Sequence, residues 1–580
     1  MIKPYIDLHC HTNLSDGNLT PQELVDQARA SGIRVLAITD HNYFDESIFN
    51  SLREQNPDIQ FITGAEISCL YCDSMGQEHE LHVPALGFDP SNEELKAVFA
   101  HNQPDRRPYV NRILDKLRDN SIDLGSYDEI KARYPDTKYI GRMAIARCMY
   151  EEGYTSSIDE SFDIYLSAHG EARAYVKNPL RFVSLETAVS AILHAGGVAT
   201  LGHLLYYKMD ESENERLVKY FKSLAGDRGA IEVYYARYDA PKRLYLLQLS
   251  QKYGLMPSAA SDYHAQEKWE RLDNHFSYSV CGEILDCLGV QVDDAVSPVN
   301  FLVISGFSGA GKGTILKKIV DEKGLVNGLP IRVIVSVTTR DPRGPQDSYI
   351  FTSREHFTEM VNNGQFLEHN DSYSKQGYGT PISGVCDAVA SGYIPCLEID
   401  RVGLLRLLTD GKINCRNIRS VFVCAPAADV AKRLITRRTE TKEAILRRLK
   451  TSREEASYVS MYDNVVVNSN LEEATEKVIR AFNGKVCRDE FNHVLFKEDM
   501  DCILNDLGTN TSIWRDPVES TAAYKAAMIE IRKRLDIEYP KDKHVLGICH
   551  AIWSRKKELL AADGIDWLTP TEMNPTVYFD

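Results

Sequence analysis

Histidine and acidic side chains stand at the ends of several short apolar runs between residues 9 and 264, and this feature constrains the fold most. The runs include "VLAITD", "FITGAE", "VATLGH" and "GLMPSAASD", which we predict to be buried strands. Helical patterns lie between them, such as "TPQELVDQARASG", with Thr20 as N-cap and a proline after it. Alternating strands and helices build a parallel sheet or barrel, in which the carboxyl ends of the strands meet on one face. We therefore expect these polar side chains to converge.

The converging side chains are candidate metal ligands. In "DLHCHTNLSDG", residues 7–17, two histidines lie two positions apart on a predicted strand, so both point the same way. Mixed imidazole and carboxylate ligands suit zinc, manganese or iron. Any one histidine is more often a packed or surface residue, but nine such residues at predicted strand ends are hard to obtain by chance. The nine are His9, His11, Asp16, His41, Glu66, His82, His203, Asp262 and His264.

The motifs around these residues resemble the polymerase-and-histidinol-phosphatase (PHP) family of metal-dependent phosphoesterases. "DLHCHTNLSDG", "ITDHN", "GAEIS", "HVPALGF", "GH" and "SDYH" follow the family's order. The resemblance implies a distorted (β/α)7 barrel over residues 1–296 that holds two or three divalent metals and hydrolyses a phosphate ester. Such ions lower the pKa of a bound water and neutralise phosphate oxygens.

A polar, helical stretch at residues 100–180 interrupts the barrel pattern and is expected to be an inserted cap. Within it, "IGRMAIARCMYEEGY" resembles the branch of the family that includes nucleotide phosphatases and a 5′ exonuclease. That branch usually has Pro-His where this chain has Met143 and Ala144. Arg142 is a candidate catalytic clamp, because a guanidinium matches phosphate in a bidentate way, although a solvated helix charge fits it equally well.

A second signature, "FLVISGFSGAGKGT", begins abruptly at residue 301. A G-x-x-x-x-G-K loop between an apolar strand and a helix wraps its backbone N–H groups around the phosphates of Mg-ATP, and Lys312 reaches the terminal phosphates. The hydroxyl that usually follows the lysine comes one place later, after Gly313, a variant that nucleoside monophosphate kinases often carry. The expected ATP-binding residues are Gly306, Ser308, Gly309, Gly311, Lys312, Gly313 and Thr314.

The motifs that follow resemble guanylate kinase over residues 299–485, which implies a P-loop α/β kinase fold. They are "SVTTRDPR", "YIF", "FLEHNDSYSKQGYGTP", "CLEIDRVG" and "RRTETKEAILRRL". The resemblance implies catalytic arginines at Arg437 and Arg448 on a lid. It also implies that the acceptor is bound by Ser336, Arg340, Arg343, Tyr349, Glu368, Tyr378, Thr380 and Asp400. The stretch "RGPQDSY" lacks the longer loop and the glutamate that guanylate kinases have there.

Composition limits the class of protein. No apolar run reaches the roughly 18 residues of a membrane helix, no signal peptide is recognisable, and 13 cysteines are scattered, so we expect a reducing cytoplasm and no membrane partner. The net charge of −16 disfavours nonspecific binding to nucleic acid. The stretch 291–300 is predicted to be a linker, and residues 486–580 a small, mainly helical module whose role the sequence does not indicate.

The hypothesis from the sequence is a bifunctional enzyme that acts on small phosphate esters or nucleotides. The first half is a multinuclear-metal phosphoesterase, and the second is an ATP-dependent kinase of a nucleoside monophosphate, with GMP favoured by Glu368 and Asp400. Three alternatives stay open. One is a cyclic ribose-phosphate phosphodiesterase fused to a ribose 1,5-bisphosphate kinase of the phosphonate pathway. Another is a 5′-end nucleic-acid exonuclease with a nucleotide-binding domain, and the last is a non-catalytic scaffold.

Overall fold

The chain folds as two compact units in the computed structural model. One unit comprises residues 1–298 and 405–415, and the other comprises 299–404 and 416–580. None of the described helices combines the length and apolar character that crossing a bilayer requires. The structure describes all residues except 1–4, 104, 136, 138–139, 169, 178–180, 265–271, 273–275, 292–299, 323–324, 343–348, 371–375, 415–416, 438–440, 510–512, 541–546, 576, 578 and 580. Most of the predicted linker at 291–300 therefore lies outside the described residues.

Two sheets form the centre of the first unit. One has the strand order β1-β2-β3 and the other β6-β4-β5-β7-β8-β9. Isolated bridges between Cys10 and Tyr263 and between His41 and Glu66 connect the two sheets. The strands are β1 (Tyr5–Cys10), β2 (Ile33–Ile38), β3 (Gln60–Phe61), β4 (Gly64–Cys72), β5 (Glu78–Leu86), β6 (Val183–Ser184), β7 (Val198–Leu201), β8 (Gly229–Tyr235) and β9 (Met256–Ala260).

The sheets are mixed, which confirms the expected α/β class with a distortion. Pairing is parallel from β1 to β3 and from β7 to β9, whereas β4 and β5 form a long antiparallel pair from Gly64–Leu86 to Cys72–Glu78. Helices connect the strands. They are α1 (Pro21–Ala30), α2 (Glu46–Gln55), α3 (Glu93–Asn102), α8 (Leu185–His194), α9 (Glu211–Ala225), α10 (Ala240–Tyr253) and α11 (Gly282–Leu288). Thr20 caps α1 in a capping box with Glu23, as the sequence predicted.

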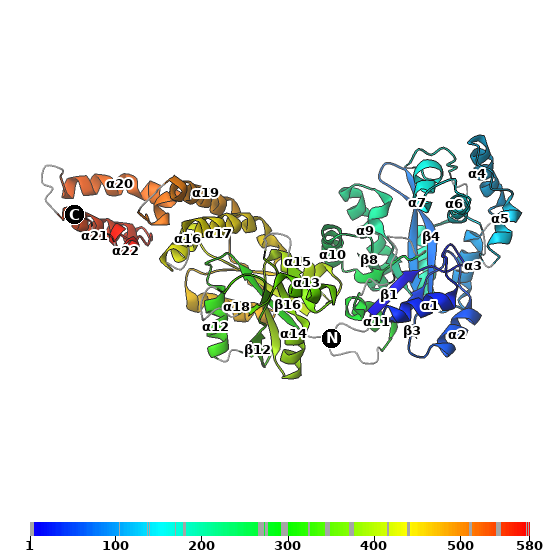
Figure 1. Ribbon diagram of the computed structural model, residues 1–580, viewed down its shortest axis with the longest axis horizontal. Coiled ribbons are helices and arrows are strands. Elements are labelled where there is room, and N and C mark those ends of the chain that lie inside the picture. The colour runs from blue at the N-terminus through cyan, green and yellow to red at the C-terminus, as the bar shows by residue number, and fades with distance from the viewer. Residues whose placement is uncertain are drawn as a thin grey trace. The chain divides into compact units, whose positions relative to one another are not determined.

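A separate group of helices lies between β5 and β6 in the sequence. These are α4 (Arg107–Asp119), α5 (Tyr127–Arg133), α6 (Arg142–Glu151) and α7 (Ile158–Ser161), and Figure 1 shows them gathered at one end of the unit. They bury a core of their own, which includes Val110, Ile113, Leu117 and Ile145. This helical group occupies the stretch where the sequence predicted a cap.

The second unit is built on a parallel sheet of order β12-β17-β10-β18-β19, with β11 antiparallel at the edge, and a smaller sheet of order β14-β13-β16-β15. Strand β10 is central, so the loop that follows it leaves from the carboxyl edge of the sheet. The strands are β10 (Phe301–Gly306), β11 (Leu325–Val326), β12 (Leu329–Val333), β13 (Val337–Thr338), β14 (Ile350–Phe351), β15 (Phe366–Asn370), β16 (Tyr378–Pro381), β17 (Ile394–Glu398), β18 (Ile418–Cys424) and β19 (Asn464–Val467).

Helices cover this sheet and continue beyond it. They are α12 (Lys312–Asp321), α13 (Arg354–Asn362), α14 (Ile382–Ala390), α15 (Arg401–Thr409), α16 (Ala427–Thr436), α17 (Lys442–Glu455), α18 (Leu471–Phe482), α19 (His493–Thr509), α20 (Ala522–Glu538), α21 (Ile548–Ala562) and α22 (Pro570–Met573). Helices α20 and α21 form a small core with Leu560 and Trp567, whereas α19 lies beside α17 (Figure 1). The C-terminal stretch is therefore helical, as expected.

Candidate metal centre and nucleotide site

The nine predicted metal ligands gather at one face of the first unit, although they come from strands and loops far apart in the sequence. His9 is the last residue but one of β1 and His11 lies just beyond that strand, while His41 follows β2. Glu66 of β4 and His82 of β5 are not cross-strand partners, but their side chains are in contact. The remaining members, Asp16, His203, Asp262 and His264, lie in loops that follow β1, β7 and β9. The argument that strand ends converge holds for the residues that follow β1, β2, β7 and β9. It does not hold for Glu66, which stands near the start of β4, or for His82, which lies in the middle of β5, because these two antiparallel strands run across the site.

Glu66 lies at the middle of this cluster. Its Oε1 lies 3.2 Å from His9 Nε2, from His82 Nδ1 and from His203 Nε2, and its Oε2 lies 2.9 Å from His41 Nδ1. The side chain is fully buried. Its Oε2 also lies 3.4 Å from His11 Nε2, so this one carboxylate would help to hold the ions together with five imidazoles.

Asp16 lies close to a second set of imidazoles. Its carboxylate lies 3.4 Å from His41 Nε2 and from His264 Nε2, and 3.7 Å from His11 Nδ1. The ligand atoms form three groups, each spanning less than 4.8 Å. They are His11–Asp16–His41–His264, His9–His11–Glu66 and His41–Glu66–His82. This grouping suits two or three divalent ions.

Buried polar atoms in the cluster support a metal. His11 Nδ1 and His203 Nδ1 are fully buried and have no hydrogen-bond partner among the described residues. Such atoms are costly unless something satisfies them. A cation would use their lone pairs, so the residues present fit a metal centre.

The charges in the cluster keep its carboxylates ionised. Burial raises the pKa of Glu66, but His82, His9 and His41 outweigh it, and the pKa lies well below the ordinary value. Burial and the neighbouring His264 lower the pKa of His11 to about 3. Burial lowers the pKa of His41 and of His82, but the neighbouring carboxylates outweigh it and raise the two values to about 9 and about 10. Metal binds an ionised carboxylate and a neutral imidazole, so these two rings would release a proton when an ion binds.

Glu232 is a functional candidate that sequence reasoning missed. It stands on β8, where its Oε1 lies 2.6 Å from His9 Nδ1 and its Oε2 accepts a 2.7 Å hydrogen bond from the backbone N–H of His203. A carboxylate behind a ligating imidazole fixes the ring's orientation and raises its basicity. The available signal was an acid inside the otherwise apolar run "IEVYY", because a buried acid on a strand needs a partner.

Two of the predicted ligand residues have a strained backbone. His203 has φ of 25° and Asp262 has φ of 52°, in the left-handed region that non-glycine residues rarely adopt. Asp262 is also held by a 2.7 Å hydrogen bond from the hydroxyl of Tyr235. Strain of this kind persists where the surrounding structure enforces it, which is common at functional sites.

Arginines from the helical cap face the metal cluster across a cavity of about 200 Å³. The predicted Arg142, at the start of α6, lines it together with Arg106 and Arg147, which sequence reasoning missed, and with His41 and His82. The wall also contains the aromatic side chains Tyr109, Phe162 and Phe182. Cationic and aromatic groups opposite metal ligands would suit a phosphate attached to a flat apolar group.

The phosphate loop of the second unit joins β10 to α12. Gly306, Gly309 and Gly311 have φ of 148°, 90° and 99°, conformations that L side chains rarely adopt. A Cβ at Gly306 would lie 2.2 Å from the carbonyl oxygen of Val423. Glycine is therefore required for the backbone to curl at the N-terminus of α12, where its N–H groups can bind an anion.

Polar side chains complete the phosphate end of the site. Lys312 Nζ donates to the carbonyl oxygens of Gly306 at 2.8 Å and Phe307 at 3.2 Å. Arg448 of α17 donates from Nε to Ser308 Oγ at 2.6 Å, so the lid helix contacts the loop directly. Gly313 and Thr314 are exposed on the first turn of α12. Arg437 is exposed at the end of α16, and it is not among the residues that line the cleft.

The predicted acceptor residues divide into two places. Tyr349, Tyr378 and Asp400 line a cleft of about 850 Å³ together with Gly306, Ser308, Lys312 and Arg448. Glu368 and Thr380 lie on β15 and β16 of the smaller sheet, with the Thr380 hydroxyl 2.6 Å from the buried Glu368 carboxylate. Ser336 precedes β13, and Arg340 stacks over the Tyr349 ring at 4.7 Å. Arg343 lies outside the described residues.

The cleft contains charged groups that sequence reasoning did not identify, Arg401, Arg447 and Glu455. Burial raises the pKa of Glu455 to about 7, and the nearby Lys312 only partly opposes this. Arg447 precedes Arg448 on α17, so "RRL" contributes two cations to the cleft rather than one.

Comparison with known proteins shows two families in one chain. The PHP domain profile matches residues 7–236, and the guanylate kinase profile matches residues 299–485. A 5′-3′ exoribonuclease of Haemophilus influenzae is 31% identical over 272 residues, which are 47% of this chain and 94% of that protein. A guanylate kinase of Clostridium perfringens is 38% identical over 194 residues, 32% of this chain and 84% of that protein. The solved guanylate kinase of Anaplasma phagocytophilum is 28% identical with a TM-score of 0.24, covering 33% of this chain and 90% of its own.

Proposed function

Since this chain belongs to the PHP family over its first part and to the guanylate kinase family over its second, we propose that it hydrolyses a nucleotide phosphate ester and phosphorylates GMP from ATP. The chain is an enzyme in both parts, a metal-dependent phosphoesterase joined to a guanylate kinase. The proposal concerns the substrates, the metals and the residues that act on them. We assign the first activity to residues 1–296 and the second to 299–485.

The observation that carries the first activity is the single Glu66 carboxylate within 3.2 Å of four imidazoles. Divalent ions at such ligands supply a water of lowered pKa and neutralise the phosphate oxygens. We propose zinc, manganese or iron, because the ligands mix imidazole with carboxylate. The nine ligands hold the ions in place, and Glu232 orients His9 and the backbone of His203.

The cap supplies the substrate contacts. Arg142 and Arg106 face the metal ligands and would hold a phosphate by paired N–H donors. Tyr109 and Phe162 on the same wall would contact a base or another flat group. This combination is the support for a nucleotide rather than a simple sugar phosphate as substrate.

For the kinase, the supporting observation is a phosphate loop that opens into the same cleft as Tyr349, Tyr378 and Asp400. Phosphoryl transfer needs positioning and positive charge on the phosphate oxygens. Lys312 and Arg448 would supply this charge for Mg-ATP, and Glu368 with Thr380 presents polar atoms that could read a guanine edge. We propose a reducing cytoplasm as the location, supported by twelve described cysteines that are all free.

One assay tests the kinase. The full chain is incubated with Mg-ATP and each of GMP, AMP, CMP, UMP and ribose 1,5-bisphosphate, and ADP is followed. Turnover of GMP that is lost in Lys312→Ala supports the proposal. Turnover of ribose 1,5-bisphosphate but not GMP would favour the ribose-phosphate alternative, and no difference between parent and Lys312→Ala would end the kinase assignment.

A second candidate for the first half is trimming of RNA from its 5′ end. The observation that favours it is the Haemophilus influenzae relative, named a 5′-3′ exoribonuclease and covered over 94% of its length. The same metal ligands would serve, so the assays differ only in substrate. Release of 5′ nucleotides from a 5′-labelled RNA, lost in His9→Ala, would establish this activity. Release of phosphate from mononucleotides alone would exclude it.

A further inference from the structure

Helix α19 lies outside the stretch that the guanylate kinase profile matches, yet it packs against the phosphate loop. The ring of Phe496 stacks on the ring of Phe307 with centroids 4.3 Å apart and planes 12° apart. Phe491 contacts both rings, at 5.6 Å and 5.4 Å. Phe307 is the second residue of the loop "GFSGAGKG" and is fully buried.

The stack continues from the loop toward the cleft. Phe307 meets Phe422 of β18 edge-on at 5.1 Å, and Phe422 meets Tyr462 at 4.9 Å. Both Phe422 and Tyr462 line the nucleotide cleft. A continuous aromatic column therefore runs from α19, behind the phosphate loop, to the cleft wall.

The backbone of Phe307 is part of the loop's own hydrogen bonding. Its N–H donates to the carbonyl oxygen of Val423 at 3.3 Å, and its carbonyl oxygen accepts from Ala310 N–H at 3.0 Å and Lys312 Nζ at 3.2 Å. The position of the Phe307 ring is therefore tied to the position of the loop backbone and of Lys312. A change in what packs against the ring will move groups that would contact phosphate.

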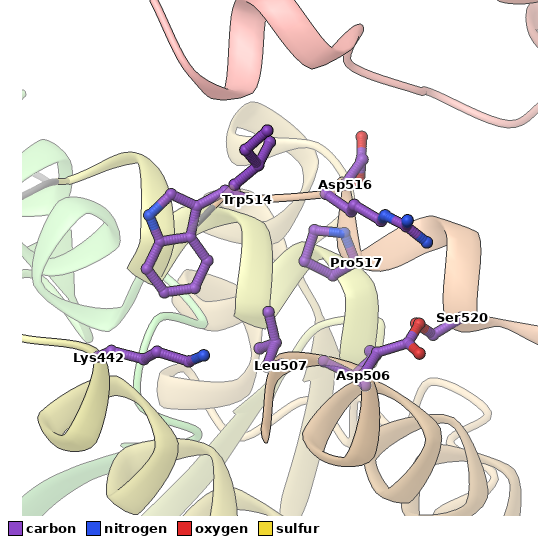
Figure 2. Close-up of a pocket in the computed structure, with 10 residues that line it drawn as sticks. Lys442, Asp506, Leu507, Trp514, Asp516, Pro517 and Ser520 are labelled. Carbon is purple, nitrogen blue, oxygen red and sulfur yellow. The ribbon is translucent and has the colours of Figure 1, made fainter. Parts of the chain in front are cut away.

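Helix α19 also runs antiparallel along the lid helix α17. Arg453 of α17 forms a bidentate pair with Asp501 at 2.5 Å and 2.7 Å, and Lys497 donates to Ser457 just beyond α17. At the other end, Figure 2 shows Lys442 of α17 and Leu507 of α19 lining one cavity of about 220 Å³. Arg448 of the same lid helix donates to Ser308 of the loop. The phosphate loop, the lid helix α17 and α19 thus each contact the other two.

We propose that Phe496 is a positioning residue for the phosphate loop, and that α19 is a part of the kinase that supports loop and lid together. It acts through Phe307 and does not touch the nucleotide. The inference rests on the kinase activity proposed above. It goes beyond that activity because the guanylate kinase profile ends at residue 485, before α19 begins at His493.

The test compares Phe496→Ala and Phe496→Leu with the full-length parent. Removal of the ring should raise the KM for Mg-ATP about three- to tenfold, the range expected for loss of a stacked aromatic pair. The leucine variant should lie between alanine and parent. The KM for the acceptor should stay within twofold, because the stack lies behind the phosphate loop. Leu495→Ala is the matched control, since Leu495 is the preceding residue of α19 and is 46% exposed.

If Phe496 were only structural, its removal would lower the melting temperature without changing the KM for Mg-ATP more than the KM for the acceptor. The melting temperature and both KM values are therefore measured. The proposal is overturned if the KM for Mg-ATP in Phe496→Ala equals that of Leu495→Ala. If the alanine variant does not fold, Phe496→Leu decides in the same way. Calorimetric binding of Mg-ADP distinguishes failure of this inference from failure of the kinase assignment. A parent that binds Mg-ADP but turns over no acceptor would refute only the assignment, and Phe496→Ala should still weaken Mg-ADP about three- to tenfold.

Discussion

Glu232→Gln should lower the metal affinity of the first unit while leaving that unit folded. One oxygen of the carboxylate lies 2.6 Å from His9 Nδ1, and the other accepts a 2.7 Å hydrogen bond from the backbone N–H of His203. Glutamine keeps the shape but has only one accepting oxygen, and its NH₂ group faces a donor in either orientation. The substitution therefore removes one hydrogen bond and the negative charge behind a metal-ligating ring.

The magnitude follows from these contacts. A hydrogen bond to a charged group contributes about 1.5–3 kcal/mol, which corresponds to about one to two orders of magnitude in an equilibrium constant. Loss of a partner behind a metal ligand typically weakens metal binding about 10- to 100-fold. We expect a loss in that range for the ion held by His9, with a matching loss of phosphoesterase activity at limiting metal.

The assay is metal titration of the chelator-treated full chain, followed by elemental analysis after dialysis against a metal buffer. Glu213→Gln is the matched control. Glu213 is also a buried carboxylate, 8% exposed, but it binds Tyr71, Ser74 and Arg216 rather than a metal ligand. Metal affinity in Glu232→Gln within twofold of the Glu213→Gln control would refute the assignment of Glu232 as the group that orients His9.

Three further outcomes are expected. Lys312→Ala should lower kinase turnover by at least about 100-fold, as loss of a preorganised cation does, and leave phosphate-ester hydrolysis at the parent rate in the same preparation. Gly309→Ala should lower the free energy of unfolding of the second unit by about 1–3 kcal/mol, because φ is 90° and the new Cβ would lie 3.1 Å from the Val430 carbonyl oxygen. Denaturant unfolding measures this, and an unchanged free energy of unfolding would contradict the loop geometry. Glu455 holds a proton in the folded state up to its pKa of about 7, whereas the unfolded chain releases it near 4.5, so stability should fall as pH rises between these values. Glu455→Gln should flatten that slope in melting temperatures measured from pH 4.5 to 8, and an unaltered slope would show that another group causes it.

Much of the metal site could be predicted because its residues are local signals at strand ends. His9, His11 and Asp16 lie within eight positions, and the barrel argument alone places His203 and His264 near them. Glu232 was missed because a single acid in an apolar strand does not say which imidazole it will face. That partner is set by how the sheet that holds β8 between β7 and β9 packs against the sheet of β1, which depends on the whole barrel.

The kinase half shows the same limit. Loop glycines and the strand–loop–helix context predicted the phosphate loop, because those requirements are local. Arg437 is exposed at the end of α16 and its expected role on a lid stays a prediction, since the direction of a lid residue depends on tertiary packing. The stacking of Phe496 on Phe307 joins residues 189 positions apart in sequence, and no periodic pattern encodes that pairing.

The left-handed backbone at His203 and Asp262 has a consequence for how this chain would respond to laboratory evolution. Glycine at either position would relieve backbone strain, which is worth about 1 kcal/mol per residue, but would delete a metal ligand. A bound ion stabilises the folded chain and opposes this gain, so selection for heat resistance should favour loss of a ligand only where metal is withheld. Libraries selected for thermal stability therefore also need a screen for phosphate-ester hydrolysis, because a more stable variant can lack this activity.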